Sequence, residues 1–208
     1  MTPAALTQFG QSAAERHAAI LNFVDSIDVA SDTIESTDHQ SDAFAEAIFL
    51  RAFTHYESSV ETLFLHYVTG GVSLSGGRAN TYLSIQDEGH ARRLTKAGNR
   101  FLSWAKPTEI RTTAQNYIEN GWPLVDMMAA KEQALADCER VRNRIAHNSF
   151  EAAQQFSIVQ RNMLGTERLF DLSPGQFLRI RSVRHRKTHL KHYIETLYET
   201  LEALLDPR

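Results

Sequence analysis

One short stretch of the chain combines the residue types that acid–base chemistry on a phosphate requires. Arg142, Asn143 and His147 lie within CERVRNRIAHNSF, residues 138–150, at the end of an apolar-periodic run. An imidazole has an ordinary pKa of about 6.5, so it can remove or deliver a proton near neutral pH. The planar guanidinium of arginine suits the charge that develops on the non-bridging oxygens of a phosphate. The stretch is therefore a candidate site for proton transfer and phosphate binding.

The spacing of these residues predicts how a helix would present them. Asn143 and His147 are four residues apart, so their side chains share a helical face and can form a hydrogen bond that orients the imidazole. Arg142 lies about 140° around an ideal helix from His147, so the two meet only if the arginine curls, the helix end deforms or a dimer interface joins them. The plainer alternative is that Arg140, Arg142, Arg144 and His147 only stabilise the helix C-terminus, by roughly 0.3–1 kcal/mol.

A second cationic segment, RIRSVRHRKTHLKH, spans residues 179–192 and holds six Arg and Lys residues, three histidines and no acid. It is either a solvated basic face or a surface that contacts the phosphate backbone of a nucleic acid. His185, His189 and His192 could share a helical face, but six neighbouring cations would repel a divalent ion, so we predict no metal site and no cofactor. The secondary candidates for RNA contact are Arg140, Arg144, Arg184, Arg186, Lys187 and His189.

Composition restricts the class of protein. The 208 residues are 42% hydrophobic and 23% charged, as in an ordinary globular chain. The net charge of −3 divides into −8 over residues 1–77 and +5 over the remainder, which argues against a protein that coats nucleic acid over its whole surface. The single cysteine, Cys138, excludes an internal disulfide and a cysteine-based zinc site. We expect a cytoplasmic protein, because no signal peptide or uninterrupted apolar span is present.

Apolar periodicity predicts an all-α helical bundle of about five to six helices in a single domain, residues 1–208. An insertion over about residues 70–122 separates the second and third long helices. Asn148, with Glu151 three residues later, forms a capping-box-like pair, so Asn148 is expected to cap the helix that reaches Leu164. The segment LFDLSPGQFLRIRSV is expected to be irregular or a short β segment. Five predicted helices cover Pro3–Ala30, Ser41–Thr69, Pro123–Ile145, Asn148–Leu164 and Thr188–Leu205, and the insertion holds two further candidate helices, Asp87–Ala97 and Pro107–Asn120.

The segment RNRIAHNS, residues 142–149, resembles the signature of the HEPN superfamily: arginine, a polar residue that is often asparagine, a few residues, then histidine, late in a long helix. The resemblance extends to FLRAFTHYESSVETLFLHYV, which is similar to the long second helix of RiboL-PSP-type HEPN domains. GHARRLTKAGNRFLSWAKPTEI and LSPGQFLRI are similar to the insertion and the segment after the motif in that group. It covers roughly residues 41–205, and its specific motif is Arg142, Asn143 and His147.

The resemblance implies a metal-independent endoribonuclease that acts as a homodimer, with both Arg–His pairs in one cleft. Attack of a ribose 2′-OH on the adjacent phosphate would give 2′,3′-cyclic phosphate and 5′-OH ends. Such domains resemble effectors of prokaryotic stress, toxin–antitoxin and antiphage systems, so an inhibitory antitoxin or regulatory protein is a further expected partner. The alternatives are a non-catalytic module that binds RNA or protein, and a metal-dependent hydrolase that uses the histidine cluster.

Overall fold

The chain folds into helices, which confirms the predicted all-α class. The computed structural model describes residues 1–31, 38–97, 103–165, 172–182 and 184–207; within these ranges it holds nine α-helices, one 3-10 helix and only isolated β-bridges. There are more helices than the five to six expected, because the run after Pro123 divides and a short helix forms where an irregular segment was expected. The helices are α1 (Pro3–Ser31), α2 (Asp38–Val68), α3 (Glu88–Ala97), α4 (Pro107–Tyr117), η1 (Glu119–Gly121), α5 (Leu124–Ala130), α6 (Glu132–Ala146), α7 (Phe150–Leu164), α8 (Pro174–Arg179) and α9 (His189–Leu205).

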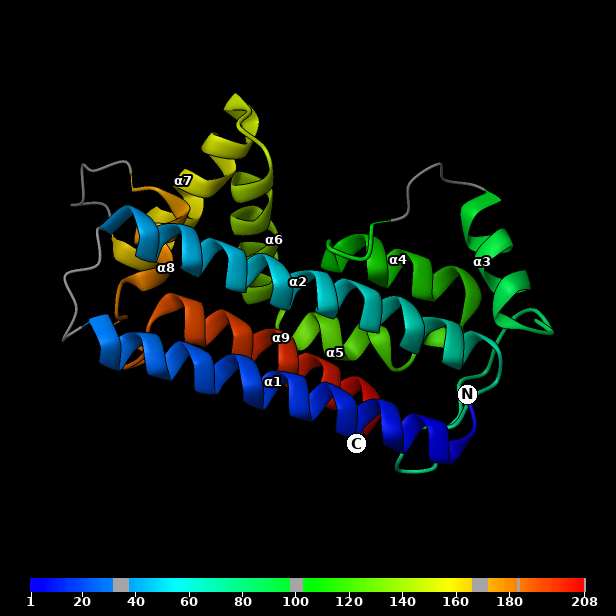
Figure 1. Ribbon diagram of the computed structural model, residues 1–208. Helices are drawn as coiled ribbons and strands as arrows, with labels where there is room; N and C mark the ends of the chain where they lie inside the picture. The colour runs from blue at the N-terminus through cyan, green and yellow to red at the C-terminus, as the bar shows by residue number, and fades with distance from the viewer. Residues whose placement is uncertain (32–37, 98–102, 166–171, 183, 208) are drawn as a thin grey trace.

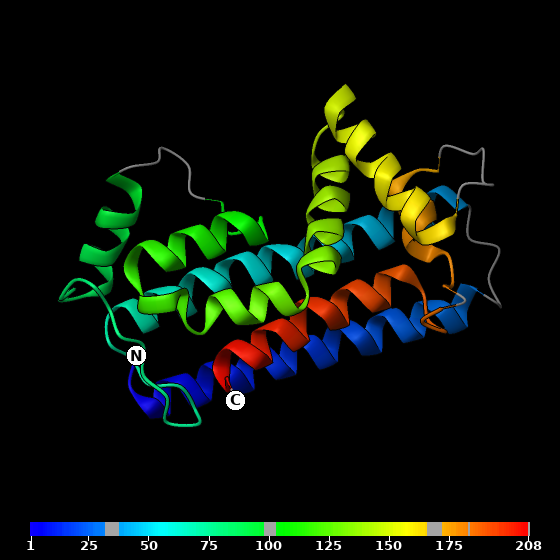
Figure 2. The same cartoon turned by 180° about the vertical axis from the view of Figure 1, so that it is seen from behind.

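The three longest helices, α1, α2 and α9, run side by side along the length of the molecule (Figures 1 and 2). α2 is central: it packs against α8 and α9 along much of its length and also contacts α3 and α6. Its apolar positions recur every three or four residues, so they fall on one face and are buried together. The buried set on α2 includes Phe49, Phe53, Tyr56, Val60, Leu63, Phe64 and Tyr67.

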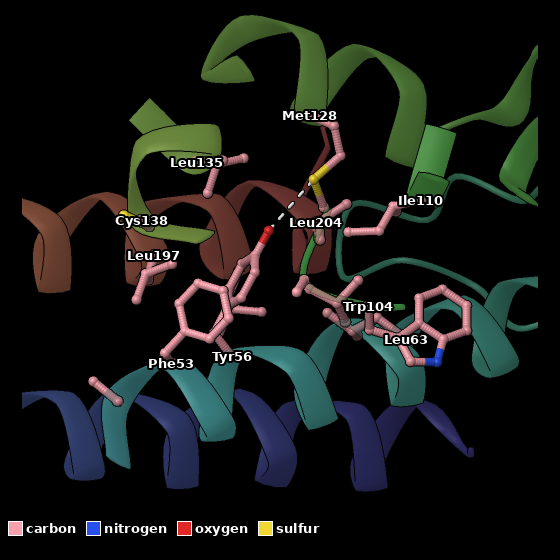
Figure 3. Packing of buried hydrophobic residues seen from close by; sticks show 14 of the residues in the cluster. Phe53, Tyr56, Leu63, Trp104, Ile110, Met128, Leu135, Cys138, Leu197 and Leu204 are labelled. Atoms are coloured by element: carbon pink, nitrogen blue, oxygen red, sulfur yellow. Dashed lines mark hydrogen bonds between the residues drawn. The ribbon is translucent and has the colours of Figure 1, made fainter. Parts of the chain in front are cut away.

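The core continues from α2 through α9 to α5 and α6 (Figure 3). The side chain of Tyr56 extends across this core, and its hydroxyl donates a hydrogen bond to Sδ of Met128 at 3.5 Å. Cys138 of α6 is fully buried beside these residues, and burial raises the pKa of its thiol well above the ordinary value. The thiol is thus a buried, protonated core group, as its apolar sequence neighbours predicted.

The end of α2 is set by two glycines. The amide of Gly70, in the left-handed region at φ 81°, donates to the carbonyl of Tyr67, and the amide of Gly71 donates to the carbonyl of His66 at 2.8 Å. A Cβ on Gly71 would lie 2.1 Å from the His66 ring, so only glycine fits there. The chain then enters the expected insertion, where Asp87 immediately precedes α3 and its Oδ1 accepts the amide of His90 in the first turn of that helix.

Helices α6 and α7 form a hairpin that rises steeply from the layer of α1, α2 and α9 (Figures 1 and 2). They pack against one another, diverging from their connection toward their other ends, and the connection, residues 147–149, projects away from the rest of the chain. The base of α6 is anchored by buried Leu135, Cys138 and Val141, whereas Ala146, His147 and Asn148 at the connection are exposed. The hairpin therefore carries its C-terminal α6 residues out to solvent.

Two predictions about this region were wrong in detail. The expected single helix from Pro123 to Ile145 is broken at Lys131, whose φ of −128° and ψ of 20° separate α5 from α6. The cap of α7 is Ser149, whose hydroxyl accepts the Ala152 amide at 3.1 Å, so the predicted cap at Asn148 was one residue early. Apolar periodicity runs through Lys131 because both helices bury the same side, and periodicity alone does not reveal the change of direction.

The segment around Ser173 also differs from expectation. It forms the short helix α8 instead of an irregular or β segment, because Ser173 and Gln176 make reciprocal hydrogen bonds in a complete capping box and Pro174 occupies the first turn. Residues 169–171 and 183 of the predicted segment lie outside the described residues. α8 packs against α2 closely enough that a Cβ on Gly175 would lie 2.6 Å from the Asp42 backbone.

Candidate functional site

The three motif residues lie at the outer end of α6. Arg142 and Asn143 lie near its C-terminal end and are half-buried, and His147 is its C-cap. The helix ends there because His147 adopts an extended conformation at φ −134° and ψ 126°, while its amide still donates to the carbonyl of Asn143 at 2.9 Å. The side chain of His147 is consequently placed in solvent at the tip of the hairpin.

Arg142 is held by a polar network that links α6 to α2. Its Nη1 donates to Oδ1 of Asn143 at 3.1 Å, and its Nη2 lies 3.8 Å from Oε2 of Glu57 on α2. Asn143 in turn donates from Nδ2 to Oε1 of Glu139 at 2.7 Å. These contacts orient the Arg142 guanidinium near the end of α6.

The predicted hydrogen bond between Asn143 and His147 does not form within one chain. The Asn143 amide is occupied by Glu139 and Arg142, and the extended backbone of His147 turns its ring off the helical face that the spacing assumed. In the part of the chain that the structure describes, the exposed His147 ring makes no hydrogen bond, and Arg142 curls toward Asn143 and Glu57 instead of toward it. A single protomer thus brings Arg142 and Asn143 together and leaves His147 apart.

Carboxylates surround the motif and shape its electrostatics. Partial burial raises the pKa of Glu57, and the nearby Arg142 charge acts in the opposite direction. The Lys106 ammonium, whose hydrogen bond to Glu109 raises its pKa, also interacts with the charges of Glu139 and Glu151. An incoming phosphate would therefore have to compete with Glu57 for Arg142.

The two flanking arginines proposed for RNA contact are engaged within the helix. Arg140 donates from Nη1 to Oδ1 of Asp137 at 2.9 Å, and this buried carboxylate also accepts from Gln133. Burial raises the pKa of Asp137, and the hydrogen bonds from Gln133 and Arg140 oppose that shift. Arg144 donates to Oδ1 of Asn148 at 2.9 Å and remains accessible at the tip.

The second cationic segment is only partly committed to ion pairs. Arg179 pairs with Asp42 of α2 at 2.8 Å and Lys191 with Asp25 of α1 at 2.6 Å, so these two side chains connect helices across the fold. Lys187 pairs with Glu195 within the α9 region. Arg184 and Arg186 are exposed, so of the predicted contacts in this segment these two arginines remain accessible.

The histidines of this segment do not share one face. His189 begins α9, is 0% exposed and stacks on Phe177 with ring centroids 4.5 Å apart, so it cannot contact RNA and that prediction was wrong. His185 precedes the helix and stacks on His192 at 3.8 Å. Burial first, and then neighbouring charges, lower the pKa of both His189 and His192 to about 4. Among the described residues, no three His, Cys, Asp or Glu side chains are grouped to hold a metal ion.

The sequence analysis missed Glu57, Glu139 and the exposed Phe150. Glu139 precedes Asn143 by four residues, so helical spacing contained the signal for that contact. Glu57 lies 85 positions from Arg142, and only the packing of α6 on α2 joins them. Phe150, 79% exposed at the start of α7, reads in sequence as a core position.

Comparison with protein-family models, with curated proteins and with solved structures finds no match to this chain. No helix in the described part of the chain is both long and apolar enough to cross a bilayer.

Proposed function

We propose that the chain is a metal-independent endoribonuclease of the HEPN type that acts as a homodimer. The observation that carries the proposal is the tip of the α6–α7 hairpin, where the Arg142 guanidinium, oriented by Asn143 and Glu57, lies near the end of the helix whose C-cap, His147, has an exposed imidazole with no hydrogen bond to a described residue. This combination supports phosphate binding by Arg142 and proton transfer by His147.

The chemistry follows from the two residue types. An imidazole removes the proton from a ribose 2′-OH, the 2′-oxygen attacks the adjacent phosphorus, and the bond from phosphorus to the 5′-oxygen breaks. A second proton donor protonates that 5′-oxygen, which leaves a 2′,3′-cyclic phosphate and a 5′-OH. Arg142 stabilises the charge that develops on the non-bridging oxygens. Asn143 positions Arg142 through its side-chain oxygen.

The need for two imidazoles supports a dimer. One protomer supplies His147 at a projecting tip and does not bring it onto Arg142, so a complete site requires a second tip beside the first. The strongly exposed ring of Phe150, three residues beyond His147, and the partly exposed Ile158 offer apolar area for such an association. In the dimer one histidine acts as base and the other as acid.

The test is RNA cleavage in EDTA by wild type and by His147→Ala, with His39→Ala as a matched control, since His39 is also exposed and lies in the first turn of α2. We expect chelator-resistant cleavage that leaves cyclic-phosphate ends, that drops by about 10²–10⁴-fold in His147→Ala and that is unchanged in the control. Equal cleavage by wild type and His147→Ala would contradict the assignment. Inhibition by EDTA would favour the metal-dependent hydrolase instead.

A second candidate is a non-catalytic module that binds RNA or a protein, favoured by the ion pair that ties Arg142 to Glu57. Under this alternative the motif stabilises the hairpin, and Phe150 is the contact residue. RNA binding by wild type with no cleavage under any of the conditions would support it.

The ribonuclease activity proposed for the α6 tip fits an effector of a prokaryotic toxin–antitoxin or antiphage system. An inhibitory protein that covers the exposed tip would be its natural regulator.

A further inference from the structure

A pocket of about 530 Å³ is lined by residues of α1 and α2. Both helices rest on α9, and α1 packs on α9 more extensively than on α2, which leaves room between the first two helices. The volume is in the range that binds small molecules. The pocket is lined by Arg16, Ala19, Ile20, Phe23, Ile48, Arg51 and His55.

The charge in this pocket stands out from its surroundings. Residues 1–77 contain ten acids and only two bases, and both bases, Arg16 and Arg51, line the pocket. Neither guanidinium forms an ion pair or hydrogen bond with any described residue, and no described lining residue is acidic. In an acidic half of the chain, two cations that line one pocket and have no carboxylate partner among the described residues favour the binding of an anion.

The remaining walls are apolar. Ile20 and Ile48 are half-buried, Phe23 is 46% exposed, and Ala19 completes the α1 side. Water against these side chains is released when an apolar group covers them, which favours a ligand with a hydrocarbon or aromatic body. His55 adds a polar group without adding charge near neutral pH, because burial and the adjacent Arg16 lower its pKa.

We propose that the α1–α2 pocket binds a small amphiphile with an anionic head, such as a carboxylate on an apolar chain. The head lies between Arg16 and Arg51, within reach of His55, and the chain covers Ile20, Phe23 and Ile48. A free phosphate or a nucleic-acid backbone would pair with the two arginines but would leave the apolar side chains of the pocket exposed to water. This site is separate from the α6 tip and does not depend on ribonuclease activity.

The experiment is isothermal titration calorimetry of the full chain with octanoate and with octanol, which share a chain and differ in the charged head. We expect octanoate to bind at least tenfold more tightly than octanol. Arg16→Gln and Arg51→Gln should each weaken octanoate about tenfold and leave octanol unchanged. Arg93→Gln, an exposed arginine of α3, is the matched control and should change neither. Phe23→Ala should weaken both ligands.

Equal affinity for octanoate and octanol would overturn the anionic specificity, and unchanged octanoate binding in both arginine variants would overturn the location. Absence of octanoate binding at millimolar concentration would overturn the proposal as a whole. Light scattering then distinguishes a further case. If octanoate does not bind, the wild type is a dimer and Phe23→Ala is a monomer, the pocket is instead covered by a second copy of the chain. Circular dichroism of each variant verifies folding, and RNA cleavage measured in parallel reports on the α6 tip alone.

Discussion

The two cationic segments, residues 140–147 and 179–192, are built from the same residue types and have different fates in the fold. At the tip of α6 the side chains stay at least partly exposed on a projecting hairpin, and His147 makes no hydrogen bond with the described residues, although Arg142 pairs with Glu57 of α2. In the second segment Arg179 and Lys191 pair with carboxylates on other helices, and the histidines pack into the core or stack on one another. A cluster of charge in sequence therefore contributes to a binding surface only through those members that the fold leaves accessible.

The largest expected difference between the segments is catalytic. Arg142→Ala should reduce RNA cleavage by about 10²–10³-fold, because it removes the cation that faces the developing phosphate charge. Arg184→Ala, an equally drastic change in the second segment, should reduce it less than about threefold, since Arg184 is a single exposed cation. Initial rates on one RNA at fixed salt measure both. Similar losses in the two variants would erase the distinction between the segments.

The second prediction concerns the pH dependence of stability. In the unfolded chain the His189 imidazole has its ordinary pKa of 6.5, and in the folded chain burial lowers that pKa to about 4. Between these values the unfolded state binds more protons, so stability is full above about pH 6.5 and is lost as the pH falls toward 4. His189 accounts for about 3 kcal/mol of this loss at most.

Urea unfolding from pH 7 to pH 4.5 measures the effect. His189→Leu should flatten the dependence, because it removes the titrating ring along with two buried ring nitrogens that lack partners among the described residues. His39→Ala, which changes an exposed histidine, should retain the wild-type slope. A wild-type slope in His189→Leu would mean that other groups cause the acid sensitivity.

A smaller effect is expected from the carboxylate beside Arg142. In a His147→Ala background that prevents cleavage, Glu57→Gln should tighten RNA binding about three- to fivefold, because phosphate no longer competes with that carboxylate. Glu61→Gln is a matched control on the same helix, since Glu61 pairs with Arg92 instead. Fluorescence anisotropy with labelled RNA gives both affinities. An equal gain in the two variants would indicate a general charge effect rather than a local one.

The smallest predicted effect is conformational. Arg186 has a φ of 57° in the turn before α9, so Arg186→Gly should raise the free energy of unfolding by roughly 0.5–1 kcal/mol. RNA affinity should change less than about twofold if the turn serves mainly to connect α8 and α9. Arg181→Gly, at an exposed position of the same segment without positive φ, should be slightly destabilising. Stabilisation by both glycines would remove the backbone explanation.

Much of the fold was predictable because it depends on local pattern. Apolar periodicity over residues 41–69 predicted α2, and the predicted ends at Thr69 and Leu164 lie within one residue of the observed ends of α2 and α7. These features arise from helical spacing and backbone conformation, which neighbouring residues determine. The break at Lys131 and the helix at Pro174 were missed, the first because both helices bury one side and the second because a capping box was read as a turn.

For the candidate site, the sequence by itself determined which residues are present and that Arg142, Asn143 and His147 end a helix. It also determined that residues 1–77 carry only two basic side chains. Only the tertiary structure decided that Glu57 faces Arg142, that His189 is buried against Phe177 and that Arg16 and Arg51 line one pocket. Each of these contacts joins residues on different helices. Such pairs are set by how whole helices pack, and no local spacing rule encodes that packing.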